Sequence, residues 1–184
     1  MKNSEKIYAF HFSSVAKLGT SLEKAFAYLD DPRKLSGHMG KSSWMMVGSK
    51  MEIKLDERQG KGIGAKITLT GQMMGIQLYV NEVVVESEAP RRKSWKTVGP
   101  QKLIVMDQYK MGFELSPQGQ SVLLKVFIDY SIPSGGIGYI LGRLFGKFYA
   151  RWCTEQMIED TATHFKNEEP SVEIFQNVVD QLAA

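Results

Sequence analysis

The sequence is poor in cysteine and in long apolar runs. Its 184 residues include one cysteine, Cys153, so no internal disulfide can form, which favours a reducing compartment. The most hydrophobic long stretch, Gly135 to Ala150, is interrupted by Arg143 and Lys147 and is shorter than the roughly 20 apolar residues of a membrane span. The polar residues 1–6 do not lead into the apolar run of a secretory signal. We expect a cytoplasmic protein without stable membrane insertion, and transient contact with a membrane surface stays open.

Residues that bind metals or act as nucleophiles are also scarce. His11, His38 and His164 lie far apart in the chain, and none has the spacing of a metal site. Cys153 lies in a predicted helix with no histidine positioned to activate it, so we interpret it as a small buried hydrophobe. The segment Gly40-Lys41-Ser42 follows a helix instead of a strand and lacks the first glycine of a phosphate loop. The sequence therefore predicts neither a metal nor a cofactor.

The charge is mildly positive but uneven. The net charge is +3, and seven acidic residues against one lysine give the segment from Glu155 to the end a charge of −6. The only tight basic cluster, Arg91-Arg92-Lys93 with Lys96, surrounds the single aromatic Trp95. Nucleic-acid binders usually concentrate a larger excess of cations on one face. We therefore expect no nucleic-acid partner.

The sequence does contain the composition of a globular domain, with 43% hydrophobic and 23% charged residues. Alternating apolar residues predict strands, and apolar spacings of three and four predict helices. Thr20 to Glu23 is typical of a capping box, and Pro32 suits the first turn of a second short helix. The elements expected are a strand at 7–14, helices at 22–29 and 32–35, strands at 44–55, 63–73, 76–85, 91–98, 103–115 and 122–132, and a helix at 137–163.

This order of elements predicts the fold class. Six consecutive strands joined by short turns should pair as an antiparallel meander. A long helix laid across a curved antiparallel sheet gives an α+β domain of two layers. We expect one ligand-binding domain over residues 1–166 and an acidic tail over residues 167–184, part of which could form a short helix.

Four segments resemble a known superfamily. They are Trp44 to Met51, the turn Gly71 to Gly75, Pro90 to Trp95, and Gly142 to Cys153. With the order of elements, they are similar to a bacterial branch of the SRPBCC helix-grip superfamily, which includes START lipid-transfer domains, birch-pollen-allergen-like proteins, aromatic polyketide cyclases and CoxG-like proteins. None of the four is a catalytic signature. The resemblance implies an internal cavity between sheet and helix that binds a hydrophobic molecule.

The strand alternation predicts which side chains face that cavity. On two neighbouring strands the inward faces are apolar, with Asp107, Tyr109 and Tyr130 as polar exceptions. The ten methionines suit either a cavity for varied apolar ligands or ordinary core packing. The predicted cavity residues are Met51, Trp95, Asp107, Tyr109, Met111, Phe113, Val126, Ile128, Tyr130, Ile137, Leu141, Leu144 and Phe148.

Several of these residues have two interpretations. Asp107 is either a functional group in the cavity or a structural residue, which is hydrogen-bonded to a partner such as Arg or Tyr or turned outward by a bulge, because an unpaired buried carboxylate is costly. Trp95 either packs on the sheet or supports a ligand. The stripe Gly138, Gly142, Gly146 and Ala150 indicates either close helix packing or space for a ligand. The adjoining stripe of Arg143, Lys147 and Arg151 is either solvated or meets anionic lipid headgroups.

Three functions are compatible with the sequence. The first is binding or transport of a hydrophobic small molecule or lipid, without catalysis. The second is a cyclase or dehydratase acting on an aromatic or polyketide-type substrate, with cavity acids and tyrosines as its groups. The third is an interaction module in which the acidic tail binds a partner. The sequence fixes neither the ligand nor the oligomeric state.

Overall fold

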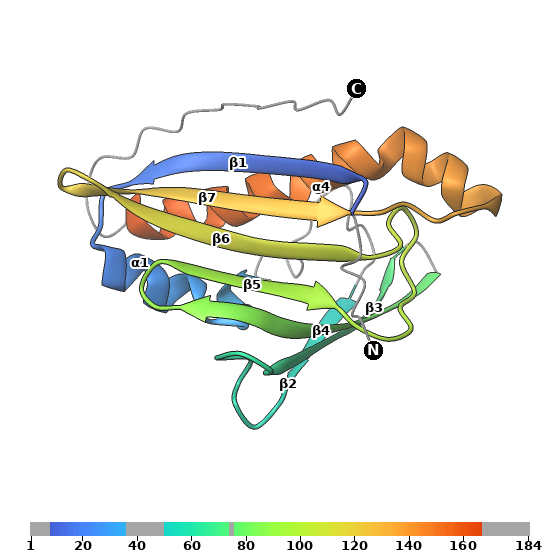
Figure 1. Cartoon of the computed structure of the whole chain (residues 1–184), viewed down its shortest axis with the longest axis horizontal. Coiled ribbons are helices and arrows are strands. Elements are labelled where there is room, and N and C mark those ends of the chain that lie inside the picture. The colour runs from blue at the N-terminus through green and yellow to red at the C-terminus, as the bar shows by residue number, and fades with distance from the viewer. Residues whose placement is uncertain (1–7, 36–49, 74–75, 167–184) are drawn as a thin grey trace, which may run out of the picture.

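The computed structural model describes residues 8–35, 50–73 and 76–166. The elements are β1 (Phe10–Leu18), α1 (Leu22–Leu29), α2 (Pro32–Leu35), β2 (Lys50–Leu55), β3 (Lys66–Met73), β4 (Ile76–Glu88), β5 (Arg92–Thr97), β6 (Tyr109–Gln118), β7 (Ser121–Tyr130) and α4 (Gly136–Lys166). The strands form one antiparallel sheet in the order β1-β7-β6-β5-β4-β3-β2 (Figure 1). The predicted α+β class, the meander and the long C-terminal helix are confirmed.

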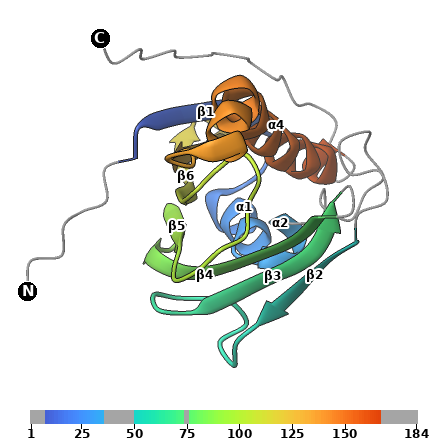
Figure 2. The ribbon, with the colours of Figure 1, turned by 90° about the vertical axis from the view of Figure 1, so that its right-hand side faces the viewer.

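The sheet curves around the two short helices (Figure 2). Helix α1 buries Ala25, Phe26 and Leu29 against the sheet, and the ring of Phe26 meets Phe113 edge to face at 5.6 Å. The second half of α4 packs against β1 and β7 and closes the core. Within the described ranges, no helix combines the length and the apolar character needed to cross a bilayer.

Local boundaries differ from the sequence prediction where hydrogen bonding decides them. Helix α1 is capped by Ser21 rather than Thr20, because the Ser21 side chain accepts a hydrogen bond from the Lys24 N–H at 3.3 Å. Strand β1 starts later and runs on to Leu18, which is buried opposite Val122. Strand β3 starts at Lys66, since Ile63 lies in an exposed turn.

The largest boundary difference concerns the segment before β6. The alternation predicted a strand from Leu103, but β6 begins at Tyr109. The Asp107 N–H instead donates to the carbonyl of Ser131 at 2.8 Å, and the preceding residues run alongside α4. The prediction failed because alternation alone does not reveal which partner a backbone group takes.

Other predictions fall outside the described residues. These are the start of the first strand at Ile7, the strand positions 44–49, the end of the turn Gly71 to Gly75, and the tail 167–184 with its possible short helix.

Candidate functional site

A pocket lies between the concave face of the sheet, α2 and the middle of α4. Its volume is about 100 Å³, and its wall is mostly apolar. It is lined by Pro32, Leu35, Ile53, Ile67, Leu69, Leu78, Val80, Glu82, Lys93, Trp95, Leu103, Met106, Tyr109, Met111, Ile128, Tyr149, Trp152, Cys153 and Met157.

Strand register builds the floor of the pocket. Trp95 on β5 pairs with Met111 on β6, and Met111 pairs with Ile128 on β7, so the three side chains form one row on the inner face. Each is less than a tenth exposed. Because side chains alternate along a strand, this row is set as soon as the register is fixed.

A carboxyl group lies buried beside this row. Glu82 on β4 is 5% exposed and accepts hydrogen bonds from the hydroxyl of Tyr109 and the indole of Trp95. Glu82 pairs with Thr97 on β5, and the Thr97 hydroxyl in turn accepts from the Tyr109 N–H at 3.2 Å. Tyr109 therefore reaches Glu82 across one intervening strand. Burial raises the pKa of Glu82 to about 7, although both hydrogen bonds oppose the shift.

Helix α4 contributes a second polar pair. Tyr149 and Cys153 are one helical turn apart and are hydrogen-bonded through their side chains. Burial raises the pKa of the Cys153 thiol to about 12, so the thiolate that a nucleophile needs is scarce near neutral pH. The pKa of Tyr149 is raised well above its usual value by the neighbouring Cys153 and by burial. Over residues 8–35, 50–73 and 76–166, no three His, Cys, Asp or Glu side chains gather as a metal site would require.

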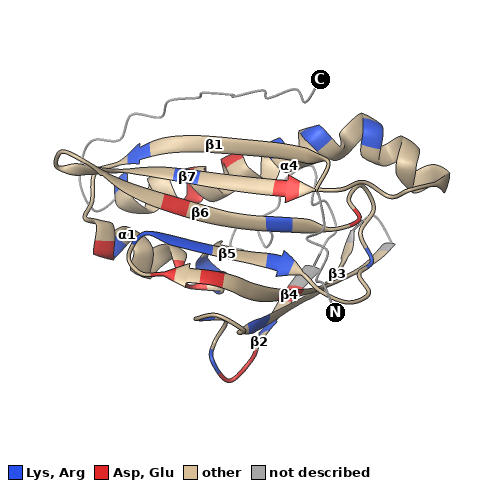
Figure 3. Ribbon diagram, in the orientation of Figure 1, with Lys and Arg blue, Asp and Glu red and all other residues tan. Residues whose placement is uncertain are grey.

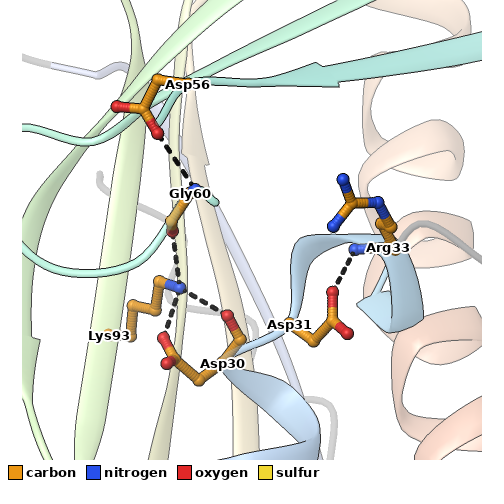
Figure 4. A network of polar contacts seen from close by, with 6 residues as sticks. All are labelled: Asp30, Asp31, Arg33, Asp56, Gly60 and Lys93. Atoms are coloured by element: carbon orange, nitrogen blue, oxygen red, sulfur yellow. Dashed lines mark hydrogen bonds and ion pairs between the residues drawn. The ribbon is translucent and has the colours of Figure 1, made fainter. Parts of the chain in front are cut away.

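A buried lysine forms part of the wall. The Lys93 side chain is 1% exposed, and its Nζ donates to Asp30 Oδ1 at 2.5 Å, to the Asp30 carbonyl at 2.9 Å and to the Gly60 carbonyl at 3.0 Å (Figure 4). Gly60 has φ +70°, and a Cβ there would lie 2.6 Å from Pro32 Cγ, so glycine is required. Asp56 Oδ1 accepts from the Gly60 N–H at 3.2 Å. Lys93 thereby joins the end of α1, the β2–β3 turn and β5.

The charge of Lys93 is balanced at this site. Burial lowers its pKa, while the hydrogen bond and charge of Asp30 oppose the shift. Three donors meet three acceptors, which matches the capacity of an ammonium group. This arrangement indicates a structural clamp rather than a reactive amine.

The structure brings some of the predicted cavity residues together. Trp95, Tyr109, Met111 and Ile128 line the pocket. Phe113, Val126 and Tyr130 are buried outside the lining set, and Tyr130 stacks on Phe10 at 5.2 Å. Leu141 is half-buried and also lies outside the lining set, and the side chain of Met51 is outside the described part of the chain.

Four of the predicted cavity residues are exposed and lie outside the pocket lining. Asp107 is exposed, because its segment leaves the sheet before β6 begins. Ile137, Leu144 and Phe148 are 77%, 66% and 46% exposed, because the opposite side of α4 packs against the body of the protein.

The glycine stripe explains the orientation of α4. Gly142, Gly146 and Ala150 are buried. A Cβ on Gly142 would lie 2.9 Å from Ile132 Cβ and 3.0 Å from the Val105 carbonyl oxygen. Of the two interpretations of the stripe, the structure supports close packing.

Sequence reasoning missed the polar pocket residues Glu82, Lys93 and Tyr149, and it placed Cys153 in the core but not in the pocket. A signal for Glu82 was present. It shares the parity of Val80 and Val84 on its strand, and all three are buried. The Lys93 contacts depend on residues far away in the chain, so no local pattern predicts them.

Solved structures of other proteins have a similar fold. No family model matches the sequence, and a search of curated proteins found no match. The Zhui aromatase/cyclase from a Streptomyces species is 8% identical with a TM-score of 0.66, covering 86% of this chain and 94% of that one. Norcoclaurine synthase from Thalictrum flavum is 12% identical with a TM-score of 0.60, covering 88% and 94%. TTHA0849 from Thermus thermophilus is 13% identical with a TM-score of 0.62, covering 87% and 99%.

At such identities the likeness concerns the fold alone. The shared features are a curved antiparallel sheet and a long C-terminal helix, as the resemblance of the sequence implied. The chain has the helix-grip fold that these solved structures share.

Proposed function

We propose that the protein binds a hydrophobic small molecule or lipid in the pocket between the sheet and α4. The observation that carries the proposal is an apolar pocket that encloses a few hydrogen-bonded polar groups, chiefly Glu82 and Tyr109. Ligand sites commonly combine an apolar wall with a few such groups that orient the ligand. Glu82 and Tyr109 would hold the polar end of the bound molecule.

The size of the pocket limits the ligand. A volume of about 100 Å³ is below the several hundred Å³ of typical small-molecule sites. Met106, Met111 and Met157 line the wall, and unbranched methionine side chains change rotamer readily. We therefore expect the pocket to widen on binding, with the methionines moving first.

Native mass spectrometry of the freshly purified protein, followed by solvent extraction, tests the proposal. A discrete adduct of lipid or small-molecule mass is expected. Met111→Trp and Ile128→Phe narrow the pocket and should abolish the adduct, while Ile63→Trp adds a ring at an exposed turn and should keep it. An adduct that survives in both folded pocket variants would contradict binding at this site.

A second candidate function is a cyclase or dehydratase type of reaction in the same pocket. The observation that favours it is Glu82, whose pKa of about 7 suits proton transfer near neutral pH, hydrogen-bonded to Tyr109. In this candidate function Glu82 has the role of the acidic cavity group that the sequence analysis considered for Asp107. A screen of aromatic and polyketide-type substrates with the wild type and Glu82→Gln checks this function. Turnover that Glu82→Gln leaves unchanged would count against it.

A further inference from the structure

The first half of α4 carries an exposed apolar surface. Ile137, Ile140, Leu144, Phe145 and Phe148, here called the α4 apolar face, are 77%, 57%, 66%, 49% and 46% exposed. Steps of three and four residues place Ile137, Ile140, Leu144 and Phe148 on one side of the helix, and Phe145 lies at the edge of that side. This part of α4 extends beyond the ends of β1 and β7 (Figure 1). A contiguous exposed surface of large apolar residues marks an interaction site.

The side of α4 that packs on the body of the protein is the opposite one. The opposite side of the helix presents Gly142, Gly146 and Ala150, and it is already in contact with Ile132 and the Val105 carbonyl. If the helix were rotated so that the bulky residues faced Ile132 and Val105, their side chains would not fit, because the helix backbone lies too close there. The α4 apolar face is therefore directed outward by the packing of its other side.

The charge around the α4 apolar face has one sign. From Ser131 to Thr154 the sequence holds Arg143, Lys147 and Arg151 and no acidic residue. Arg143 and Lys147 are exposed and four residues apart, so they form a basic row along the border of the apolar residues. Arg151 is paired with Glu155 at 2.9 Å. Figure 3 shows basic and no acidic residues on the extending part of α4.

We propose that the α4 apolar face docks onto the surface of a bilayer that contains anionic lipids. A helix with aliphatic and aromatic residues on one side and Lys or Arg along the border lies in the plane of a membrane interface, with the apolar residues at the boundary of the acyl chains. The basic row then meets the anionic headgroups. Antiparallel pairing with a second copy is less favourable, because the two-fold axis would then place both basic rows on the same edge of the contact.

The position of the pocket agrees with this docking. Tyr149, Trp152 and Cys153 line the pocket and follow directly after Phe148 on the same helix. A docked α4 would place this wall of the pocket near the membrane. Docking itself requires no ligand, so it stands or fails separately from the proposed function.

Vesicle flotation of the full chain tests the proposal. The probes are vesicles of phosphatidylcholine alone and of phosphatidylcholine mixed with phosphatidylserine. Two basic side chains at the surface predict a preference of roughly thirtyfold for the anionic vesicles at low salt. Arg143→Gln with Lys147→Gln should remove that preference.

Matched substitutions of exposed residues separate the α4 apolar face from general hydrophobicity. Leu144→Ser should weaken binding to the anionic vesicles by about tenfold. Ile63→Ser changes a residue of similar exposure, 62% against 66%, in the β2–β3 turn and should leave binding unchanged. Both side chains are exposed, so both variants should keep the fold, which circular dichroism checks.

Three results would overturn the proposal. The first is that the full-chain protein floats with neither kind of vesicle. The α4 apolar face would then be covered by something other than a membrane, such as a second copy, residues 167–184 or another protein. Sedimentation of the wild type and Leu144→Ser identifies the second copy in that case. The second is that Leu144→Ser binds the anionic vesicles as well as the wild type does. The third is that Ile63→Ser loses as much vesicle binding as Leu144→Ser.

Discussion

Glu82 is an acid in surroundings that favour its neutral form. Burial raises its pKa, and the hydrogen bonds from Tyr109 and Trp95 replace only part of the interaction with water that the carboxylate loses. Groups whose pKa is strongly shifted cluster at functional sites. The presence of Glu82 also makes the stability of the fold depend on pH.

Glu82→Gln should reduce that dependence. The pKa of Glu82 is about 7 in the folded protein, against 4.5 for an unperturbed glutamate side chain, so the folded state holds the proton more tightly than the unfolded chain does. The stability contributed by the protonated group is fully present below pH 4.5 and is lost as the pH rises through 7. Between these limits the variant should gain about 3 kcal/mol relative to the wild type. Urea unfolding of both proteins across this pH range measures the difference in the free energy of unfolding. A difference that does not change with pH would contradict the raised pKa of Glu82.

Cys153 should react slowly while the protein is folded. Its side chain is 5% exposed and the pKa of its thiol is about 12, so almost no accessible thiolate exists near neutral pH. Labelling with a maleimide should be at least about a thousandfold slower than in the unfolded chain. Mass spectrometry follows the reaction. Rapid labelling of the native protein would show that the pocket opens to solvent more often than the structure implies.

At the scale of elements, two contacts far apart in the chain position the parts of the fold. The Lys93 clamp holds α1 and the β2–β3 turn to β5, and the glycine stripe seats α4 against Ile132. Each contact helps to set the position of an element that lines the pocket. Both are accessible to single substitutions with controls on the same element.

Lys93→Met should destabilise the protein by roughly 3 kcal/mol. The change leaves the Asp30 carboxylate and the Gly60 carbonyl without their cation, and loss of one partner of a buried pair is costly. The control is Lys96→Met, which removes an exposed lysine from the same strand. Thermal unfolding compares the two variants. Equal effects would mean that the clamp contributes little.

Two glycines of α4 should respond to alanine with opposite signs. At Gly142 the new Cβ would lie 2.9 Å from Ile132 and 3.0 Å from the Val105 oxygen, so the helix must shift, with a loss of roughly 1 to 2 kcal/mol. At Gly146 the nearest atom would be 3.4 Å away, so helix propensity should dominate and stabilise the protein by up to about 1 kcal/mol. Urea unfolding distinguishes them. Stabilisation by both substitutions would exclude a close approach at Gly142.

The same elements show what the sequence can predict. Period and turn residues located the helices and most strands, because they are local properties of the chain. The register puts Trp95, Met111 and Ile128 on one inner row, and the alternation implied this placement for Met111 and Ile128. The orientation of α4 was not predictable from its bulky residues, since hydrophobicity favours burying Ile137 and Leu144 while packing requires the glycines. The strand predicted at Asp107 is absent for a related reason, because the Asp107 N–H donates to the carbonyl of Ser131, which lies just beyond the end of β7.

At the scale of the whole molecule, the two halves of α4 have different surroundings. The second half buries Met157, Ile158 and Phe165 in the core, while the first half exposes its largest side chains. The pocket wall begins at the transition, near Tyr149. A bound molecule would therefore contact the part of α4 that joins the stable core to the exposed face.

Ligand should stabilise the whole fold if it binds the native pocket alone. Protein refolded after extraction of its adduct should unfold at a lower temperature than the protein as purified. Returning the extracted material at about a hundred times its Kd should restore about 2.7 kcal/mol. Calorimetry measures the difference. An unchanged Tm with the adduct present would show that the adduct does not bind the native fold in preference to the unfolded chain.

The order of the sheet has a consequence for how the chain acquires its structure. Strand β1 is hydrogen-bonded only to β7 among the described strands, and the contact between His11 and Asp129 joins residues 118 positions apart. During synthesis the first strand leaves the ribosome long before its partner exists. We expect the sheet to grow from hairpins of strands that are neighbours in the sequence, with β1 added late. Contacts of such long range slow folding, so exposed β1 is the segment on which a chaperone would act for longest.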